Sequence, residues 1–241
     1  MKNVSGIGTR VARSAAVLAM LAGGLGITAA EAAPIGVPAA TTGAGKTTLG
    51  GEVNLLLDRD LEGTSTEAES SQVFATGTLG VDDRLDLVFR LGLGDVTIST
   101  PAGDVDTDLG SAFGVGFKVT WATIRDANLK VGSVFQTTRI RADLDAGPGR
   151  ASWSEYDAAL GVAFDTAGGV DPKKRTTEFA LMPYGGFAWS GVDNGVAGGQ
   201  EDDSFGLFGG LAAKTRGGLN FGVELRLVDQ TALSLGASMA F

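Results

Sequence analysis

The side chains that enzymes most often use near neutral pH are missing from this chain. Its 241 residues include no histidine and no cysteine. Histidine is the side chain best placed to exchange protons near neutral pH, and a cysteine thiolate is a strong nucleophile. Asp202 and Asp203 form a carboxylate pair, but adjacent acidic residues in a loop are usually only solvated. We therefore predict no enzyme activity and no catalytic residues.

One segment has some of the residue types of a phosphate-binding loop. Residues 40–47 read Ala-Thr-Thr-Gly-Ala-Gly-Lys-Thr. Such a loop needs glycine at its first position, a buried strand before it and a helix after it, so that backbone amides converge on phosphate. Here the first position is Ala40, and an alternating segment follows. The pattern predicts no nucleotide cofactor.

A second segment resembles the start of a calcium-binding loop. Asp104, Asp106 and Asp108 have the spacing of its first three ligands. The sixth position is Leu109 where the loop requires glycine, and the twelfth is Val115 where it requires glutamate. The EF-hand pattern therefore fails, and we assign no metal-ligating residues.

The first residues have the order of an export signal. Lys2, Arg10 and Arg13 precede an apolar run over 15–30, which is followed by Ala-Glu-Ala at 30–32. The run is too short and too rich in glycine for a good membrane-spanning helix. We predict a signal peptide over residues 1–32, cleaved near Ala32. Residues 33–45 are then a flexible N-terminal segment, and residues 46–241 form one domain.

The exported chain is acidic. Removal of residues 1–32 takes away three of the 19 basic residues and one of the 28 acidic ones, leaving a net charge of −11 over 209 residues. This argues against nucleic-acid binding, which depends on Lys and Arg neutralising phosphates. Disulfides are permitted after export, so the lack of cysteine suggests that stability comes from another source, such as closure of a barrel.

Alternation of apolar and polar residues dominates the rest of the chain. In residues 84–94 every second side chain from Leu85 to Leu93 is large and apolar, which is typical of a strand with two different faces. Windows of this kind have the length that a tilted strand needs to cross a bilayer. We predict an all-β, antiparallel up-and-down transmembrane β-barrel of about ten strands, with eight to twelve possible. The windows are 46–57, 71–81, 84–94, 111–121, 127–138, 153–164, 177–190, 204–213, 219–228 and 231–241.

Aromatic residues gather near the ends of these windows. Membrane barrels carry such girdles at both interfaces, although a soluble β-sandwich could use the same residues in its core. The predicted girdle consists of Trp121, Phe164 and Phe179 at the periplasmic ends, and of Phe113, Trp153, Tyr156, Trp189 and Phe205 at the outer ends.

The opposite faces of the strands mix carboxylates with cations. A barrel of eight to ten strands is only wide enough for side chains to fill, so we expect a lumen closed by ion pairs and hydrogen bonds. The predicted polar network comprises Glu52, Asp86, Arg90, Lys118, Lys130, Asp157, Glu178, Glu224 and Arg226.

The longer links between windows are acidic. Residues 58–70, 95–110, 139–152 and 191–203 together hold 15 acidic and four basic residues. One hypothesis is that these outer loops bind divalent cations that also bridge lipopolysaccharide phosphates. The alternative is that the charges only keep exposed loops soluble.

The last eleven residues, 231–241, alternate without a charge and end on Phe241. This ending resembles the C-terminal strand of bacterial outer-membrane barrels, whose terminal phenylalanine is an assembly signal read by the barrel-assembly machinery. Over residues 46–241 the chain is similar to the small OmpA/OmpX-type barrels of Gram-negative bacteria. The resemblance implies a location in the cell outer membrane, with lipid, lipopolysaccharide and the assembly machinery as partners. Closure requires the last strand to pair with the first, at 46–57.

Three functions are compatible with this pattern. The first is an integral outer-membrane barrel with a filled lumen and a structural or surface-interaction role through its acidic outer loops at the cell surface. The second is a porin-like, narrow channel for small solutes or ions. The third is a soluble exported β-barrel that binds a ligand, with its apolar face turned inward. Enzymes with this architecture use histidine, which is missing here. The ligand and the oligomeric state stay open.

Overall fold

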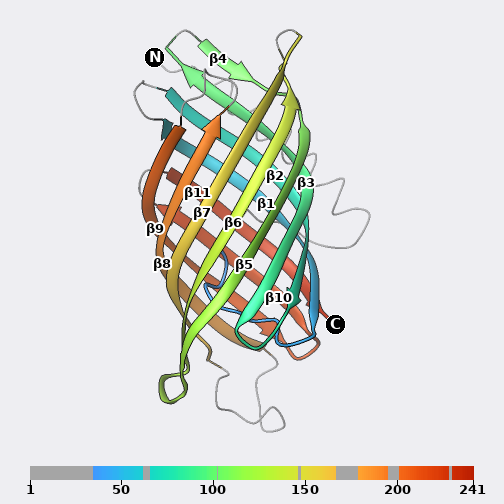
Figure 1. The fold of residues 1–241 in the computed structure, drawn as a ribbon, viewed down its shortest axis with the longest axis vertical. Coiled ribbons are helices and arrows are strands. Elements are labelled where there is room, and N and C mark those ends of the chain that lie inside the picture. Colours follow the sequence, from blue (N-terminus) through green and yellow to red (C-terminus); the bar gives the residue numbers. More distant parts are fainter. Residues whose placement is uncertain are drawn as a thin grey trace.

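Ten long antiparallel strands close into a barrel in the computed structural model (Figure 1). The structure describes residues 35–61, 66–101, 103–145, 148–166, 179–194, 201–227 and 230–241. Each long strand pairs with its neighbours along the chain, and β1 pairs with both β2 and β11. This last pairing satisfies the backbone groups that an open sheet would leave at its edges. The predicted all-β, up-and-down barrel is confirmed, and so is its strand number.

Every predicted window corresponds to one long strand. A short additional strand, β4, pairs only with the end of β3. Within the described residues, no helix is long and apolar enough to cross a membrane. The strands are β1 Thr47–Leu61, β2 Thr66–Gly80, β3 Leu85–Thr100, β4 Gly103–Asp106, β5 Gly110–Ile124, β6 Leu129–Asp143, β7 Arg150–Phe164, β8 Phe179–Asn194, β9 Glu201–Thr215, β10 Leu219–Leu227 and β11 Gln230–Ala240.

The C-terminal strand closes the barrel against the first strand, as predicted. Leu49 lies opposite Met239, and Leu55 lies opposite Leu233. The backbone N–H of Phe241 then donates to the carbonyl oxygen of Thr47 at 2.8 Å. The terminal residue is therefore held at the seam of the barrel, beside the start of β1.

Three of the connections at the end of the barrel that carries the C-terminus, β2–β3, β5–β6 and β9–β10, are tight turns, whereas β7 and β8 are joined by residues 165–178. The Oδ1 atom of Asp82 accepts the backbone N–H of Arg84 at 2.6 Å between β2 and β3. Asn128 has a φ of 51°, and Gly218 has a φ of 83°. Asparagine and glycine are the residues that adopt this left-handed backbone most readily. We call the other end of the barrel, where β1, β3, β6 and β8 end, the outer end.

The strands extend much further at the outer end than the sequence indicated. The predicted loops 58–70 and 139–152 are largely strand, because β1 continues to Leu61 and β6 continues to Asp143. The prediction was wrong here for a physical reason. Beyond the apolar belt the outward faces become polar, whereas inward positions such as Ile98 and Ile140 are apolar. The backbone ladder therefore continues where the outward apolar pattern used to find the strands has ended.

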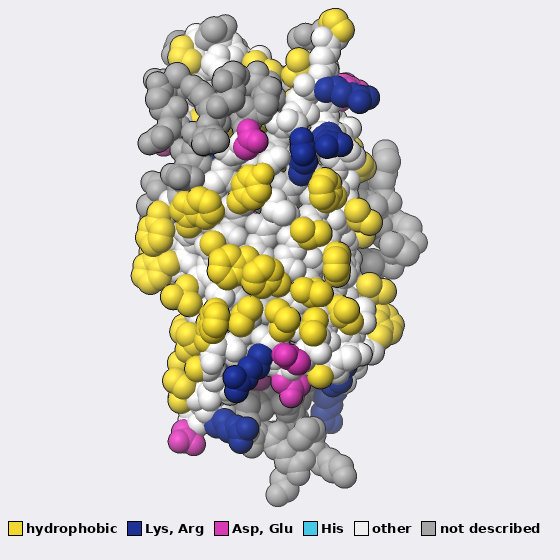
Figure 2. Space-filling model, viewed as in Figure 1, with side chains coloured by type: hydrophobic (Ala, Val, Ile, Leu, Met, Phe, Trp, Pro, Cys, Tyr) yellow, Lys and Arg dark blue, Asp and Glu magenta, His cyan; other side chains and the backbone are white. Residues whose placement is uncertain are grey.

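The outer surface of the barrel is apolar around its middle. Large apolar side chains point away from the lumen on every long strand, and Figure 2 shows them as a broad belt on one face. Leu91 is 70% exposed and Trp121 is 61% exposed. Charged side chains are visible above and below the belt but are sparse within it. This arrangement is the reverse of that in a water-soluble barrel.

Seven of the eight aromatic residues expected in the girdles lie on this outer surface. Trp153 is the exception, because it is only 2% exposed and lies inside the barrel. Tyr156 on the same strand is exposed, and odd and even positions of a strand face opposite sides. The prediction placed Trp153 by its closeness to the strand end and disregarded this alternation. The seven are Phe113, Trp121, Tyr156, Phe164, Phe179, Trp189 and Phe205.

Candidate functional site in the barrel lumen

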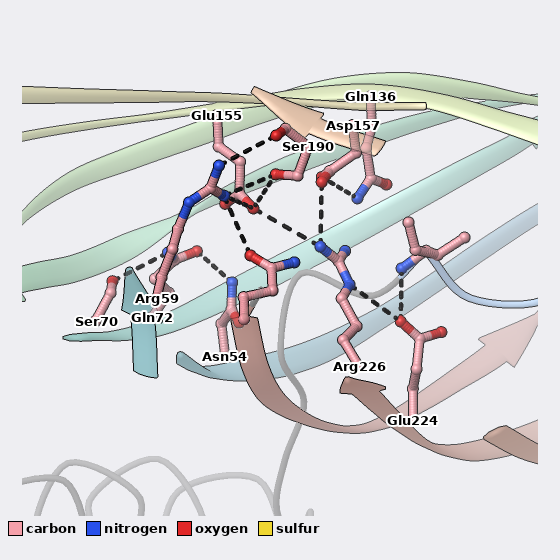
Figure 3. Close-up of polar contacts among 12 residues, drawn as sticks. Asn54, Arg59, Ser70, Gln72, Gln136, Glu155, Asp157, Ser190, Glu224 and Arg226 are labelled. Carbon is pink, nitrogen blue, oxygen red and sulfur yellow. Dashed lines mark hydrogen bonds and ion pairs between the residues drawn. The ribbon is translucent and has the colours of Figure 1, made fainter. Parts of the chain in front are cut away.

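A group of buried ion pairs crosses the middle of the lumen. The Nη1 atom of Arg226, on β10, lies 3.1 Å from Oδ1 of Asp157, on β7 (Figure 3). The Nε atom of Arg226 lies 3.5 Å from Oε1 of Glu224. Alternation places these side chains inward, and the barrel wall removes them from water. The arginine therefore joins two distant parts of the wall.

The same network continues to β1 and β3. Arg90 forms an ion pair with Glu52, with Nε and Oε1 2.5 Å apart. Its Nη1 atom donates to Oε1 of Gln136 at 2.9 Å, and the amide of Gln136 donates to Asp157 at 2.9 Å. An unbroken series of polar contacts thus runs from Glu52 across the lumen to Glu224.

A third arginine, Arg59, links this network toward the outer end. Arg59 is fully buried and donates from Nη1 to Oγ of Ser190 at 2.9 Å and to Oε1 of Gln230 at 3.1 Å. Its Nη1 atom also lies 3.9 Å from Oε1 of Glu155, which lies 3.7 Å from Nη1 of Arg226. Glu155 is therefore shared by two arginines (Figure 3).

The N-terminal segment enters the lumen and binds this network. The backbone N–H groups of Ile35 and Gly36 donate to the two carboxylate oxygens of Glu224 at 2.9 and 2.8 Å. Gly36 has a φ of 66°, and a Cβ added there would lie 2.6 Å from Nζ of Lys118. Glycine at this position lets the backbone approach both Glu224 and Lys118.

Closer to the C-terminal end of the barrel, the wall holds the rest of this segment. Oδ2 of Asp86 accepts the backbone N–H groups of Thr41 and Thr42 at 2.7 and 3.1 Å. The N–H of Ala40 donates to Oγ1 of Thr120 at 2.9 Å, and its carbonyl accepts from Lys130 at 3.2 Å. We had expected residues 33–45 to be a flexible segment. The structure instead places residues 35–40 inside the lumen as an internal plug, and the chain becomes exposed at residues 44–45 before β1 begins.

Apolar side chains fill the space on either side of the ion pairs. Ile35 of the plug packs with Val134 and Phe208 of the wall. Toward the outer end, Trp153 belongs to a buried cluster with Ile98 and Ile140. Between these layers, a cavity of about 10 Å³ lies beside Asn54, Glu155 and Arg226, which is enough for about one water molecule. In the described residues, apolar side chains and ion pairs therefore occupy successive levels of the lumen.

The structure brings most of the predicted network residues together inside the barrel. Glu178 lies outside the described residues. Reasoning from sequence missed Arg59, which was assigned to a loop, and Glu155, which alternation with Asp157 identifies as inward. The predicted residues found in the lumen are Glu52, Asp86, Arg90, Lys118, Lys130, Asp157, Glu224 and Arg226.

The arrangement can stabilise the barrel and obstruct it. Each buried arginine described above contacts carboxylates or amides, and the described residues contain no group of three His, Cys, Asp or Glu able to hold a metal ion. Carboxylates bound to guanidinium and backbone N–H groups are fixed in place by charge-assisted hydrogen bonds.

Comparison with known proteins gives structural likeness without sequence relationship. No protein-family model matches the chain, and no curated protein matches it. The translocator domain of autotransporter NalP from Neisseria meningitidis is 10% identical, with 98% of this chain and 97% of that chain covered and a TM-score of 0.44. The β domain of the Bordetella autotransporter BrkA is 12% identical, with 82% and 100% covered and a TM-score of 0.46. The outer-membrane protein OprG from Pseudomonas aeruginosa is 12% identical, with 84% and 99% covered and a TM-score of 0.35.

The names of these proteins do not describe one common role: two are domains of autotransporters, and the third is named only as an outer-membrane protein. At such low identities and TM-scores, the likeness carries no argument about function. The barrel assignment therefore rests on the strand pairings of the chain itself, and a role has to be argued from its surfaces and its lumen.

Proposed function

We propose that this chain is an integral outer-membrane β-barrel with a closed lumen and a structural or surface-interaction role, of the general kind of the small OmpA/OmpX-type barrels. The observation that carries the proposal is the distribution of polarity. Ion pairs and hydrogen-bonded amides are buried inside, whereas large apolar side chains such as Leu91 are exposed outside. Only a lipid environment makes such a surface favourable. A soluble ligand-binding barrel requires the opposite arrangement and is not favoured.

The partners follow from this proposal. Lipid covers the belt, lipopolysaccharide surrounds the outer end, and the barrel-assembly machinery reads the strand that ends at Phe241. The exposed outer end, beyond the belt, supplies the surface for interactions at the cell exterior. The signal peptide predicted over residues 1–32, which lies outside the described residues, would deliver the chain to the periplasm.

Electrophoresis of outer-membrane fractions tests the proposal. A closed barrel resists dodecyl sulfate until it is boiled, so the unboiled protein should migrate faster than the boiled protein. Replacing Leu91 with arginine should cost about 2–4 kcal/mol in the free energy of unfolding from vesicles, because Leu91 meets lipid. Leu109→Arg is the control, since Leu109 is exposed at the outer end. Migration independent of boiling, with the protein in the soluble periplasm, would exclude the proposal.

A narrow channel is the second candidate, and one observation favours it. The plug is attached to the wall at residues 35–42 by hydrogen bonds to Glu224, Asp86 and Thr120, which can break without unfolding the barrel. Planar-bilayer recordings should compare the natural protein with a variant lacking residues 33–45. We expect neither to show stable unitary conductance, because the ion pairs and the cluster around Trp153 still close the lumen. Conductance of the shortened variant alone would identify the plug as a gate.

A further inference from the structure

The outer end of the barrel carries a basic cluster directly above the apolar belt. The predicted outer links contain four basic residues, and Arg59 is buried in the lumen. The other three, Arg139, Arg141 and Arg150, lie on the outward faces of the adjacent strands β6 and β7. Figure 2 shows Lys and Arg side chains gathered above the belt on this face. Among the links of an acidic molecule, this clustering of cations requires an explanation.

Strand register places hydroxyl groups around two of these arginines. Ser111 on β5, Arg141 on β6 and Ser152 on β7 lie side by side in one row. In the next row toward the belt, Arg139 lies between Phe113 and Ser154. Neighbouring strands are about 5 Å apart, so these side chains can contact one ligand. Guanidinium and hydroxyl groups together are typical of phosphate-binding sites.

The two arginines are available to a ligand. Within the described part of the chain, no carboxylate lies within 4.0 Å of Arg139 or Arg141, and the buried Nε atom of Arg139 has no hydrogen-bond partner. The nearest carboxylates belong to other contacts or strands. Asp143 forms an exposed ion pair with Arg150 at 3.0 Å, and Asp193 lies on β8 opposite Ser154. A crevice of about 640 Å³, lined by Arg141, Ser111, Ser152 and also Asp108, opens beside the cluster.

The position of the cluster along the barrel axis, just beyond the apolar belt, indicates which kind of ligand it binds. Arg139 lies beside Phe113, and the next row toward the belt contains Tyr156. Exposed aromatic rings of this kind mark the interface between hydrocarbon and headgroups. A phosphate carried by a lipid of the outer leaflet reaches this level while its acyl chains cover the belt below. A free anion has no acyl chains that could pack against the neighbouring apolar surface.

We propose that Arg139 and Arg141, with Ser111 and Ser152, form a binding site for a phosphate group of an outer-leaflet lipid, as lipopolysaccharide carries. The inference rests on the proposed function, because it requires that the apolar belt meets lipid. The guanidinium groups bind the phosphate oxygens, the serine hydroxyls donate to the remaining oxygens, and the acyl chains lie against Phe113 and Tyr156.

The test uses the full-length exported protein, refolded in detergent, with bisphosphorylated lipid A as the probe. The natural protein should bind this lipid about tenfold or more tightly than the same lipid stripped of its phosphates. The double variant Arg139→Gln with Arg141→Gln should lose that preference. Arg84→Gln with Arg125→Gln is the matched control, because it removes the same charge from the exposed turns at the opposite end. This control should bind within about twofold of the natural protein.

Three results would overturn the site. These are equal binding by the Arg139/Arg141 variant, no preference of the natural protein for the phosphorylated lipid, and displacement of the lipid by millimolar inorganic phosphate, which indicates a site for any phosphate. If the double variant does not fold, Arg141→Gln alone replaces it, since Arg141 is exposed. If the protein inserts into the outer membrane but fails these tests, only the proposal of a lipid site is contradicted. A protein that does not insert contradicts the proposed function itself.

Discussion

Individual residues of the lumen are stabilised by one another and not by water. Burying a charge is costly unless opposite charges and hydrogen bonds surround it. Arg226 contacts Asp157, Glu224 and Glu155, and each of these carboxylates has a further partner in the wall, the plug or Arg59. Removal of one member therefore leaves several others uncompensated. The network makes the packing of the lumen specific to one arrangement of the strands.

Replacing Arg226 with methionine tests this dependence. The variant keeps most of the side-chain volume but leaves three carboxylates without their shared cation, and we expect a loss of about 3–5 kcal/mol in the free energy of unfolding. Urea titration of the vesicle-inserted protein measures it. Arg150→Gln is the control, because Arg150 is 85% exposed in its pair with Asp143 and should change stability by about 0–1 kcal/mol. Equal effects of the two variants would contradict the account.

Among the elements, the plug is the one whose position could not be predicted from the sequence. Residues 35–45 have no periodicity and are rich in glycine, proline and alanine, so they resemble a loop. Their position depends on acceptors contributed by distant strands, above all Glu224, which is 189 residues from Ile35. Only the closed barrel brings these groups together. The plug therefore depends on tertiary structure and has no local signal.

Hydrogen exchange tests how the plug is held. In the natural protein the backbone N–H groups of Ile35, Gly36, Thr41 and Thr42 donate to carboxylates, so the peptide containing them should exchange slowly. Glu224→Gln replaces one acceptor oxygen with an N–H₂ group that faces another donor. We expect exchange in this peptide to accelerate about tenfold or more, because two charge-assisted bonds are weakened.

Asp143→Asn is the matched control for that experiment. It also neutralises one carboxylate, but Asp143 lies at the exposed outer end of β6, away from the plug. Exchange in the plug should be unchanged in this variant. If Glu224→Gln leaves the plug peptide as protected as in the natural protein, Glu224 does not hold it in the lumen.

The strands themselves were largely predictable from sequence, because lipid on one side and side chains on the other impose strict alternation. Residues 84–94 show this alternation throughout, and β3 covers nearly all of them. The polar extensions beyond the belt were not predictable in the same way. The prediction for Trp153 failed for a different reason. Its position near a strand end suggested the aromatic girdle, whereas the alternation of side chains along β7 places it inside the barrel.

At the scale of the whole molecule, the chain places its polar groups inside and its apolar groups outside. Closure through β1 and β11 gives every long strand a partner on both sides, so the backbone of the belt can exist in lipid. In the described residues, the plug, the ion pairs and two apolar clusters occupy the lumen.

Fluorescence quenching of the three tryptophans tests this inverted arrangement most directly. Trp121 and Trp189 point outward, whereas Trp153 points into the lumen and its N–H has no partner within the described residues. Single-tryptophan variants, with phenylalanine at the other two positions, can be placed in vesicles of brominated lipid. The account predicts strong quenching of Trp121 and Trp189 and little quenching of Trp153, by bromine or by aqueous acrylamide. Quenching of Trp153 by lipid, or of Trp121 and Trp189 by acrylamide alone, would contradict it.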